Sequence, residues 1–137
     1  MSKENKNEYL LMFRGTDWHH GLSPQEIQEV LVRFKSWFDE LTTQGKVKGG
    51  NPLVNEGKVV SGKNGRVVAD GPFAESKEAI GGYFLVEVES QDEAVAIARN
   101  CPALAYGGQV EVRQIAPECP VFQELKEKLA EAQLVST

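Results

Sequence analysis

The stretch Y-F-L-V-E-V-E-S-Q-D-E-A-V-A-I-A, residues 83–98, decides the fold of this 137-residue chain. Its first seven residues are mostly β-branched, aromatic or aliphatic and predict a strand. Ser90 and Glu93 have the spacing of a capping box, so a helix begins directly after the strand, and Pro102 limits its length. Residues 108–115 then alternate with the period of a strand. The stretch is therefore the first half of a β-α-β unit.

A second unit of the same kind precedes it. Residues 9–14 are apolar until the last position and predict a strand. Ser23-Pro24-Gln25-Glu26 combines a Ser N-cap, Pro at the first helical position and Glu at the third. Apolar residues then recur at spacings of three and four, which predicts a helix from Pro24 to Gln44. A glycine-weakened strand over residues 46–50 completes this unit.

Two further elements lie outside the units. Residues 58–69 predict a hairpin with a type I′ turn at Asn64-Gly65, where both central residues need positive φ. Residues 117–137 begin with a proline-containing connector and continue as an amphipathic helix. The element order predicts a ferredoxin-like α+β fold, with a four-stranded antiparallel sheet, both unit helices on one face, and an extra C-terminal helix.

The expected domain organisation follows from these elements. We expect a polar, disordered N-terminal extension over residues 1–8, one folded domain over residues 9–116 and a helical C-terminal extension over residues 117–137. A chain of this length is sufficient to bury a single core without disulfides or metals.

Composition argues against several classes of partner. Fifteen basic and twenty acidic residues give a formal charge of −5, and the basic residues are scattered, which argues against nucleic acid. No apolar run is long enough to span a membrane and no signal peptide opens the chain, so we expect a cytoplasmic protein with no membrane partner. Cys101 and Cys119 match no metal or redox spacing, and no nucleotide-binding glycine motif is present. We therefore expect no metal site and no cofactor.

The strand alternation predicts an uncovered sheet face. In the first strand Leu11 and Phe13 share one face, while Leu10, Met12 and Arg14 share the other. The face away from the helices thus mixes apolar and charged side chains, and apolar patches of that kind mark interfaces. We expect a homodimer that packs two such faces together around a partly polar cavity.

Residues 70–78, D-G-P-F-A-E-S-K-E, are followed by G-G-Y-F-L-V-E-V, and residues 108–113 read G-Q-V-E-V-R. With these motifs the chain resembles the DGPF branch of the YCII-related proteins over residues 9–116. The resemblance implies a dimeric α/β barrel. In YCII-related proteins a His-Asp pair has been proposed as an acid-base site, and here Phe34 stands at the position of that histidine, while Asp70 lies in the motif.

Asp70, His19 and His20 are the candidate catalytic residues. Asp70 could act as an acid or base in the cavity, where desolvation would raise its pKa, or it could accept backbone hydrogen bonds in its own turn. His19 and His20 could replace the histidine that is missing at Phe34 as proton carriers near neutral pH, or could simply be exposed.

Five residues are candidates for substrate binding. Two arginines could hold an anionic group through their guanidinium forks, or could instead form ion pairs with Glu111 or Glu87. In the DGPF motif, Phe73 could instead be a plug that anchors the loop in the core, and Lys77 could instead belong to a solvated turn. The candidates are Arg14, Tyr83, Arg113, Phe73 and Lys77.

Two functions fit these features. The first is a small-molecule-binding dimer that acts as a cofactor-independent enzyme of the isomerase or lyase type, with Asp70 moving a proton. The second is a non-catalytic ligand-sensing or protein-interaction domain. The resemblance links the second function to sigma-factor-dependent transcription, since genes of DGPF-like proteins are often found beside those of alternative sigma factors.

Overall fold

The computed structural model describes residues 6–72 and 79–136, with side chains described as far as residue 133. Four strands form one antiparallel sheet in the order β2-β5-β1-β6. Their bounds are β1 (Asn7–Arg14), β2 (Val47–Pro52), β5 (Ile80–Val88) and β6 (Gln109–Gln114).

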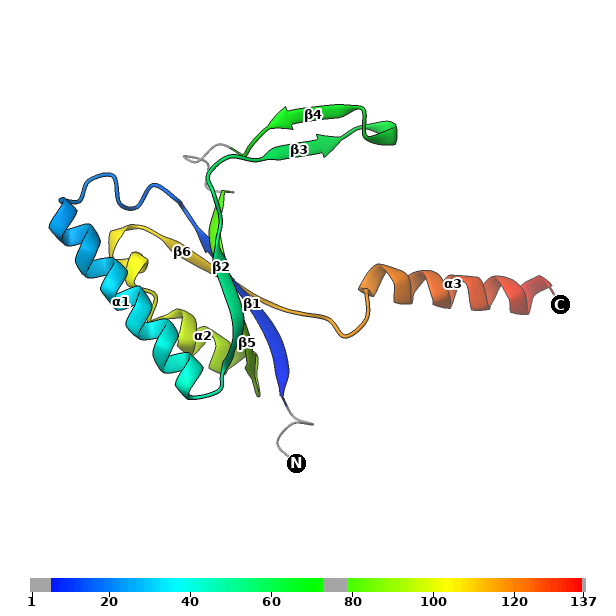
Figure 1. The fold of residues 1–137 in the computed structure, drawn as a ribbon. Coiled ribbons are helices and arrows are strands. Elements are labelled where there is room, and N and C mark those ends of the chain that lie inside the picture. The colour runs from blue at the N-terminus through cyan, green and yellow to red at the C-terminus, as the bar shows by residue number, and fades with distance from the viewer. Residues whose placement is uncertain (1–5, 73–78, 137) are drawn as a thin grey trace.

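Two helices cover one face of this sheet, α1 (Pro24–Thr43) and α2 (Gln91–Ala98) (Figure 1). A short 3₁₀ segment, η3 (Pro102–Tyr106), connects α2 to β6. Each helix joins two strands that are not neighbours, which is the ferredoxin-like arrangement. The predicted α+β class and four-stranded antiparallel sheet are therefore confirmed. No helix among the residues that the structure describes is both long and apolar enough to cross a membrane.

The sheet begins earlier in the chain than the apolar pattern predicts. Asn7 pairs with Val88 and Glu8 pairs with Glu87, so both residues belong to β1 instead of the N-terminal extension expected over residues 1–8. The side chain of Asn7 also donates a hydrogen bond to the carbonyl of Glu89, with 3.4 Å between the two atoms. Backbone pairing begins before the first apolar residue of the strand because hydrogen bonds between backbones do not depend on side-chain polarity.

Both predicted helix starts form. At α1 the Ser23 hydroxyl accepts from the Glu26 N–H at 3.2 Å, and the Glu26 carboxylate accepts from the Ser23 N–H at 2.9 Å. The backbone hydrogen bond from Ser23 lowers the pKa of Glu26. At α2 the Ser90 hydroxyl accepts from the Glu93 N–H at 3.1 Å, but the Glu93 carboxylate accepts from the N–H of Glu89 instead of that of Ser90. The second capping box therefore keeps the bond to the Ser90 hydroxyl, but its other bond comes from the residue before the cap.

The core lies between the sheet and the two helices. Leu11, Val86 and Val88 of the sheet are buried against Trp37 of α1 and Ile97 of α2. The alternate residues of β1 and β5, among them Leu10, Met12 and Leu85, are half-buried on the face that has no helix. The predicted alternation between a covered and an uncovered face is confirmed.

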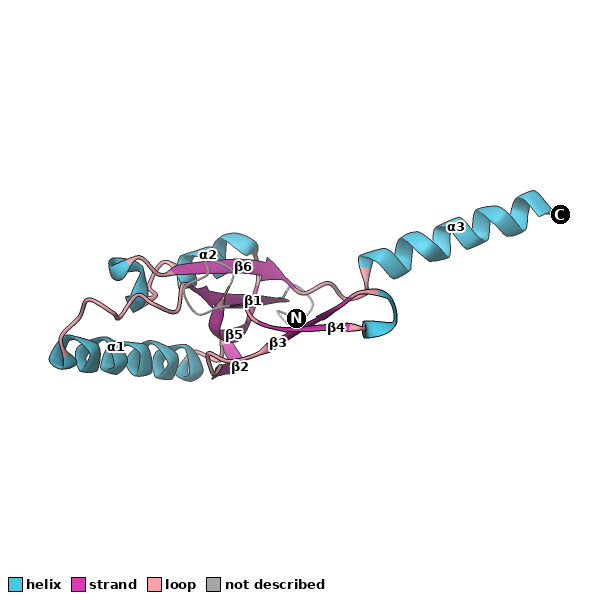
Figure 2. Ribbon diagram, turned by 90° about the horizontal axis from the view of Figure 1, so that it is seen from above, coloured by secondary structure: helices cyan, strands magenta, loops and turns pink. Residues whose placement is uncertain are grey.

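Two segments project from this body (Figures 1 and 2). Strands β3 (Lys58–Ser61) and β4 (Val67–Asp70) pair only with each other as a separate two-stranded sheet, here called the arm. Helix α3 (Pro120–Ser136) extends from the other end of the sheet. The predicted hairpin and C-terminal helix are therefore both present.

The turn of the arm differs from the predicted two-residue type I′ turn. Asn64 and Gly65 do adopt positive φ, 61° and 66°, but Gly62 does so as well, at 81°. The N–H of Gly65 donates to the carbonyl of Gly62 at 3.0 Å, and Ser61 pairs with Val67. Five residues, 62–66, therefore form the loop, which contains the short segment η2 (Lys63–Gly65).

Candidate functional site

A cavity of about 760 Å³ opens between α1 and the end of the sheet at which β1 ends. Its volume is in the range of small-molecule sites. Its lining includes five apolar aromatic side chains: Phe13, Trp18, Phe34, Phe38 and Phe84. We call this cavity the aromatic pocket.

The rings of the aromatic pocket contact one another in a continuous cluster. Phe13 is at its centre, with its ring centroid 4.9 Å from that of Phe84 and 6.0 Å from that of Phe34, both edge to face. Trp18, from the loop between β1 and α1, lies 6.3 Å from Phe34. Phe34, at the position where the YCII resemblance places a histidine, is therefore part of an apolar wall. The pocket is suited to a flat apolar group.

Glycines shape the sheet end that borders the pocket. A Cβ atom on Gly50 of β2 would lie 2.6 Å from the carbonyl oxygen of Tyr83 and 2.8 Å from Cδ1 of Phe84. A Cβ on Gly81 of β5 would lie 3.0 Å from Cγ2 of Thr16. Gly50 thus allows β2 to approach β5 closely, which is a use of glycine in strands where backbones meet.

Three of the predicted site residues line the aromatic pocket: Arg14, His19 and Tyr83. Nη1 of Arg14 donates to Oε1 of Glu111 at 3.0 Å, but its Nε is buried and has no hydrogen-bond partner among the described residues. The Tyr83 hydroxyl accepts from Nδ2 of Asn51 at 3.2 Å. The imidazole of His19 contacts the rings of Trp18 and His20, with centroids 5.4 Å and 4.8 Å away.

The other described candidates lie outside this pocket. His20 is exposed and does not line it, as expected for adjacent residues of which only one can face a site. Asp70 is exposed at the end of β4 and forms an ion pair with Lys58 of the arm. Arg113 pairs with Oε2 of Glu111 at 2.6 Å. Glu111 therefore bridges both arginines, which is the structural alternative expected for them. Phe73 and Lys77 lie outside the described residues.

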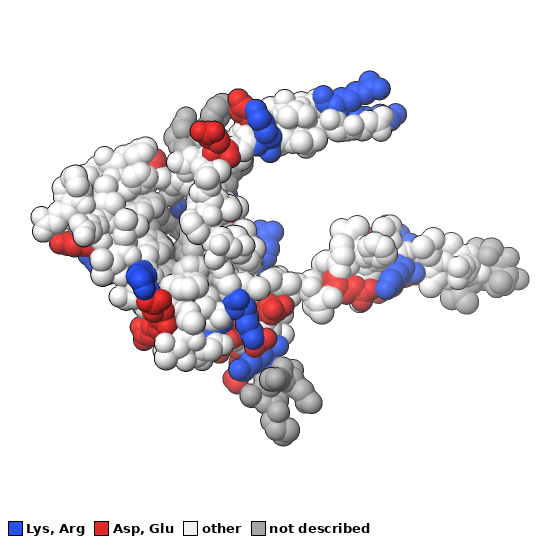
Figure 3. All heavy atoms as spheres, viewed as in Figure 1, with Lys and Arg blue, Asp and Glu red and all other residues white. Residues whose placement is uncertain are grey.

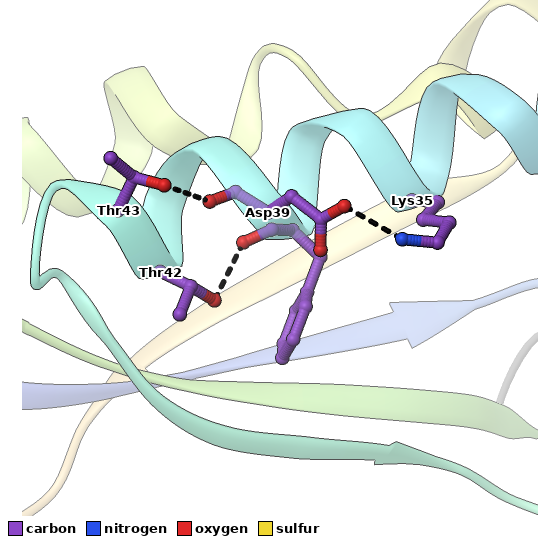
Figure 4. A network of polar contacts seen from close by, with 5 residues as sticks. Lys35, Asp39, Thr42 and Thr43 are labelled. Carbon is purple, nitrogen blue, oxygen red and sulfur yellow. Dashed lines mark hydrogen bonds and ion pairs between the residues drawn. The ribbon is translucent and has the colours of Figure 1, made fainter.

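Lys35 of α1 also lines the pocket, and the sequence did not mark it as a site residue. Its Nζ donates to Oδ2 of Asp39 at 2.8 Å, and this hydrogen bond raises the pKa of Lys35 (Figure 4). Thr43 donates to the carbonyl of the same aspartate at 3.0 Å. A Lys-Asp pair four residues apart usually belongs to a solvated helix face, so the spacing alone does not indicate a pocket.

The remaining lining gives no sign of metal or thiol chemistry. Cys101 lines the pocket and is buried, and its burial raises the pKa of the thiol, which keeps it protonated at neutral pH. Within residues 6–72 and 79–136, no three His, Cys, Asp or Glu side chains are grouped so that they could hold a metal ion.

A family of known proteins matches most of the chain. The family model of the YCII-related domain matches residues 8–119. The uncharacterized protein R00369 of Rhizobium meliloti (strain 1021) is 45% identical over 51 residues, which are 36% of this chain and 41% of that protein. The chain thus matches less than half the length of this relative.

One of the solved structures that match the chain has low sequence identity to it. It is the 5-chloro-2-hydroxyhydroquinone dehydrochlorinase TftG from Burkholderia phenoliruptrix AC1100, in complex with 2,5-dihydroxybenzoquinone. The match has a TM-score of 0.44 and 18% sequence identity, and it covers 80% of this chain and 93% of that one.

Proposed function

The chain belongs to the YCII-related domain family, and on that premise we propose that it binds a small, flat, negatively charged molecule in the aromatic pocket. The observation that carries this proposal is the combination of an aromatic lining with an arginine whose buried Nε has no hydrogen-bond partner among the described residues. Pockets for small molecules are typically apolar with a few polar groups that fix orientation.

The ring cluster supports a planar ligand. Phe13, Phe34 and Trp18 present rings at centroid distances typical of favourable aromatic pairs. A flat aromatic ligand would extend this cluster, whereas a bulky aliphatic ligand would make fewer face and edge contacts.

The cationic groups support a negative charge on the ligand. Arg14 and Lys35 both line the pocket, and each is already paired with one carboxylate, Glu111 and Asp39. The buried Nε of Arg14 has no acceptor among the described residues, which is unfavourable, so turning this guanidinium toward a ligand carboxylate or phenolate would give the donor a partner.

The test measures binding of four probes to the full chain by calorimetry: benzoate, salicylate, benzyl alcohol and cyclohexanecarboxylate. We expect the two aromatic anions to bind most tightly. Arg14→Gln should weaken benzoate binding by about tenfold, because hydrogen bonds to charged groups stabilise by roughly one decade or more. Arg113→Gln is the matched control, since it also pairs with Glu111 but lies outside the pocket. Equal binding of benzoate and benzyl alcohol would contradict the proposed charge.

Within this site we propose cofactor-independent proton transfer of the isomerase or lyase type, with His19 as the acid or base. His19 lines the pocket, and histidine is the side chain best suited to carry a proton near neutral pH. Asp70 lies outside the pocket of its own chain, so its proposed acid-base role would require the cavity between two copies.

Phenylpyruvate, a flat ring with a carboxylate and an acidic C–H, tests the reaction. Exchange of that proton with D₂O, followed by NMR, should be faster with the protein than in buffer. His19→Gln should slow the exchange by about a hundredfold, the usual size of a general acid-base contribution, with His20→Gln as the control. A loss in Asp70→Asn instead would assign the role to Asp70.

A second candidate function is a non-catalytic domain that senses a ligand or binds a protein, linked to sigma-factor-dependent transcription. One observation favours it: the imidazole of His19 has ring contacts but no hydrogen bond to a carboxylate among the described residues. Catalytic histidines are commonly oriented by such a partner. Tight binding of benzoate without any acceleration of exchange would support this function over the enzyme.

We also propose that the chain is a homodimer joined through the uncovered sheet face. The half-buried side chains of Leu10, Met12 and Leu85 on that face support it, because apolar side chains that gather on one surface favour burial against a partner. Glu111 of the same face is ion-paired with Arg14 and Arg113, which reduces the unfavourable effect of bringing its charge into an interface.

A further inference from the structure

The chain exposes more surface than a compact protein of its size. Its accessible surface is 10097 Å² for a mass of 15.1 kDa. Folded single-chain proteins of this mass expose roughly 7,100 Å² by the usual scaling of surface with mass. The surplus is roughly 3,000 Å² by the same scaling. The arm and α3, which project from the body, contribute to this surplus (Figure 1).

The arm is apolar on both faces and uncovered on both. Val60 pairs with Val68 on one face, and Val59 pairs with Ala69 on the other. All four are exposed. Charged side chains are confined to the root, at Lys58 and Asp70, and to the turn, so the middle of the arm is uncharged (Figure 3). An isolated two-stranded hairpin is at best marginally stable in water.

Helix α3 also exposes an apolar side. Four large apolar side chains leave 49% to 63% of their surface exposed, and helical spacing gathers them on one side. They are Val121, Phe122, Leu125 and Leu129. An isolated helix of this length is marginal in water, so its stability has to come from packing. Residues 120–136 lie beyond the YCII-related match.

We infer that the arm of one copy packs against α3 of a second copy, and the reverse, so that the two segments clasp the dimer. The inference rests on the homodimer proposed above. Within one chain the arm follows β2 and precedes β5 at the end of the sheet near Arg14, whereas α3 follows β6 at the end near Tyr9. A two-fold axis perpendicular to the strands makes the two sheets run in opposite directions. Each arm then lies at the same end of the dimer as the partner's α3.

The area available supports a second copy as the occupant. A standard interface buries about 800 Å² on each partner, and obligate homodimers bury roughly 1,000 to 2,500 Å² on each. The surplus of roughly 3,000 Å² is sufficient for the upper part of that range. Both segments lie on the side of the sheet away from α1 and α2, next to the uncovered face (Figures 1 and 2).

Sedimentation of the full chain tests the clasp. The wild type should have the mass of two 15.1 kDa chains at micromolar concentration. Val60→Asp in the arm and Leu125→Asp in α3 should each raise the dissociation constant by about tenfold or more, because burial of one such side chain is worth at least that factor. Lys63→Asp in the turn and Gln123→Asp, on the far side of α3 from Leu125, are the matched controls and should change little.

The double variant tests whether the two segments meet each other. If the arm contacts the partner's α3, Val60→Asp and Leu125→Asp break the same contact, so their combined effect is less than the product of the two. Circular dichroism establishes that each variant is folded. A wild type that sediments as one chain overturns both the clasp and the homodimer. A dimer that neither variant weakens, or variants whose effects multiply, overturns the clasp alone.

Discussion

Leu11 in the middle of β1 has no exposed surface, whereas Val60 in the middle of β3 leaves 62% of its surface exposed. Both are aliphatic residues in antiparallel strands, and the difference lies in what surrounds them. The body of the chain supplies its own cover, because two helices cross one face of its sheet. The arm and α3 have the same kinds of apolar residue but no cover from the part of the chain that the structure describes. Local sequence determines which elements form, and the neighbours available determine how stable they are.

The largest test of this contrast is truncation of Leu11. Leu11→Ala should lower the free energy of unfolding by about 2 to 5 kcal/mol, since it removes buried methyl groups and leaves a cavity. Val60→Ala should lower it by less than about 1 kcal/mol at dilutions where the chain is monomeric, because the side chain is exposed there. Urea denaturation measures both. Similar losses for the two variants would mean that the arm is covered within a single chain.

The close approach of strands in the body gives the second test. Gly50→Ala should destabilise by about 1 to 3 kcal/mol, the range for overpacking, because its Cβ would lie 2.6 Å from a backbone oxygen. Gly49→Ala is the neighbouring control, since nothing lies within 4 Å of a Cβ there. Urea denaturation compares them. If Gly50→Ala is as stable as Gly49→Ala, β2 and β5 are less closely packed than in the structure.

Helix caps give a smaller effect. Ser90→Ala should destabilise by about 1 kcal/mol, the typical value of an N-cap, because the Glu93 N–H loses its acceptor. Cys119→Ala, at the start of the projecting α3, should change stability much less because cysteine is not a preferred cap residue. Thermal denaturation of both variants measures the difference. A larger loss for Cys119→Ala would show that the start of α3 is held by its neighbours.

The smallest expected effect is a pH dependence at the first helix. The pKa of Glu26 is lowered in the folded chain, so its contribution to stability is fully present above the ordinary pKa of 4.5 and is lost as the pH falls through the folded value. Glu26→Gln should therefore lower the thermal midpoint at pH 7 but leave it nearly unchanged at the lowest pH that keeps the chain folded. A constant difference across that range would contradict this assignment.

The sequence predicted what depends on local pattern. The strand periods, the Ser caps of both helices and the spacing of two β-α-β units were sufficient to predict the sheet and its helices, and the pattern of α3 was sufficient to predict that helix. The predicted length of the turn at Asn64-Gly65 was wrong, because three residues adopt positive φ where the motif requires two. Such a choice depends on the loop as a whole and not on one dipeptide.

The site was predicted only in part, because residues distant in the sequence meet there. Arg14, His19 and Tyr83 were chosen for their chemistry, and the structure brings them to one pocket. Asp70 was chosen from the motif, yet the strand that carries it belongs to the arm, and Asp70 does not line the pocket of its own chain. Lys35 was missed because its helical spacing to Asp39 is that of an ordinary surface pair.

One further consequence comes from the segment that leads into the arm. Pro52, the last residue of β2, and Asn55, in the segment between β2 and β3, both line the aromatic pocket. The position of the arm and the shape of the pocket wall therefore share the same few backbone angles. If the proposed dimer restrains the arm and that restraint changes the affinity for a ligand in the pocket, a bound ligand changes the stability of the dimer by the same factor, because such coupling is reciprocal. The occupancy of the pocket would then depend on the concentration of the protein itself.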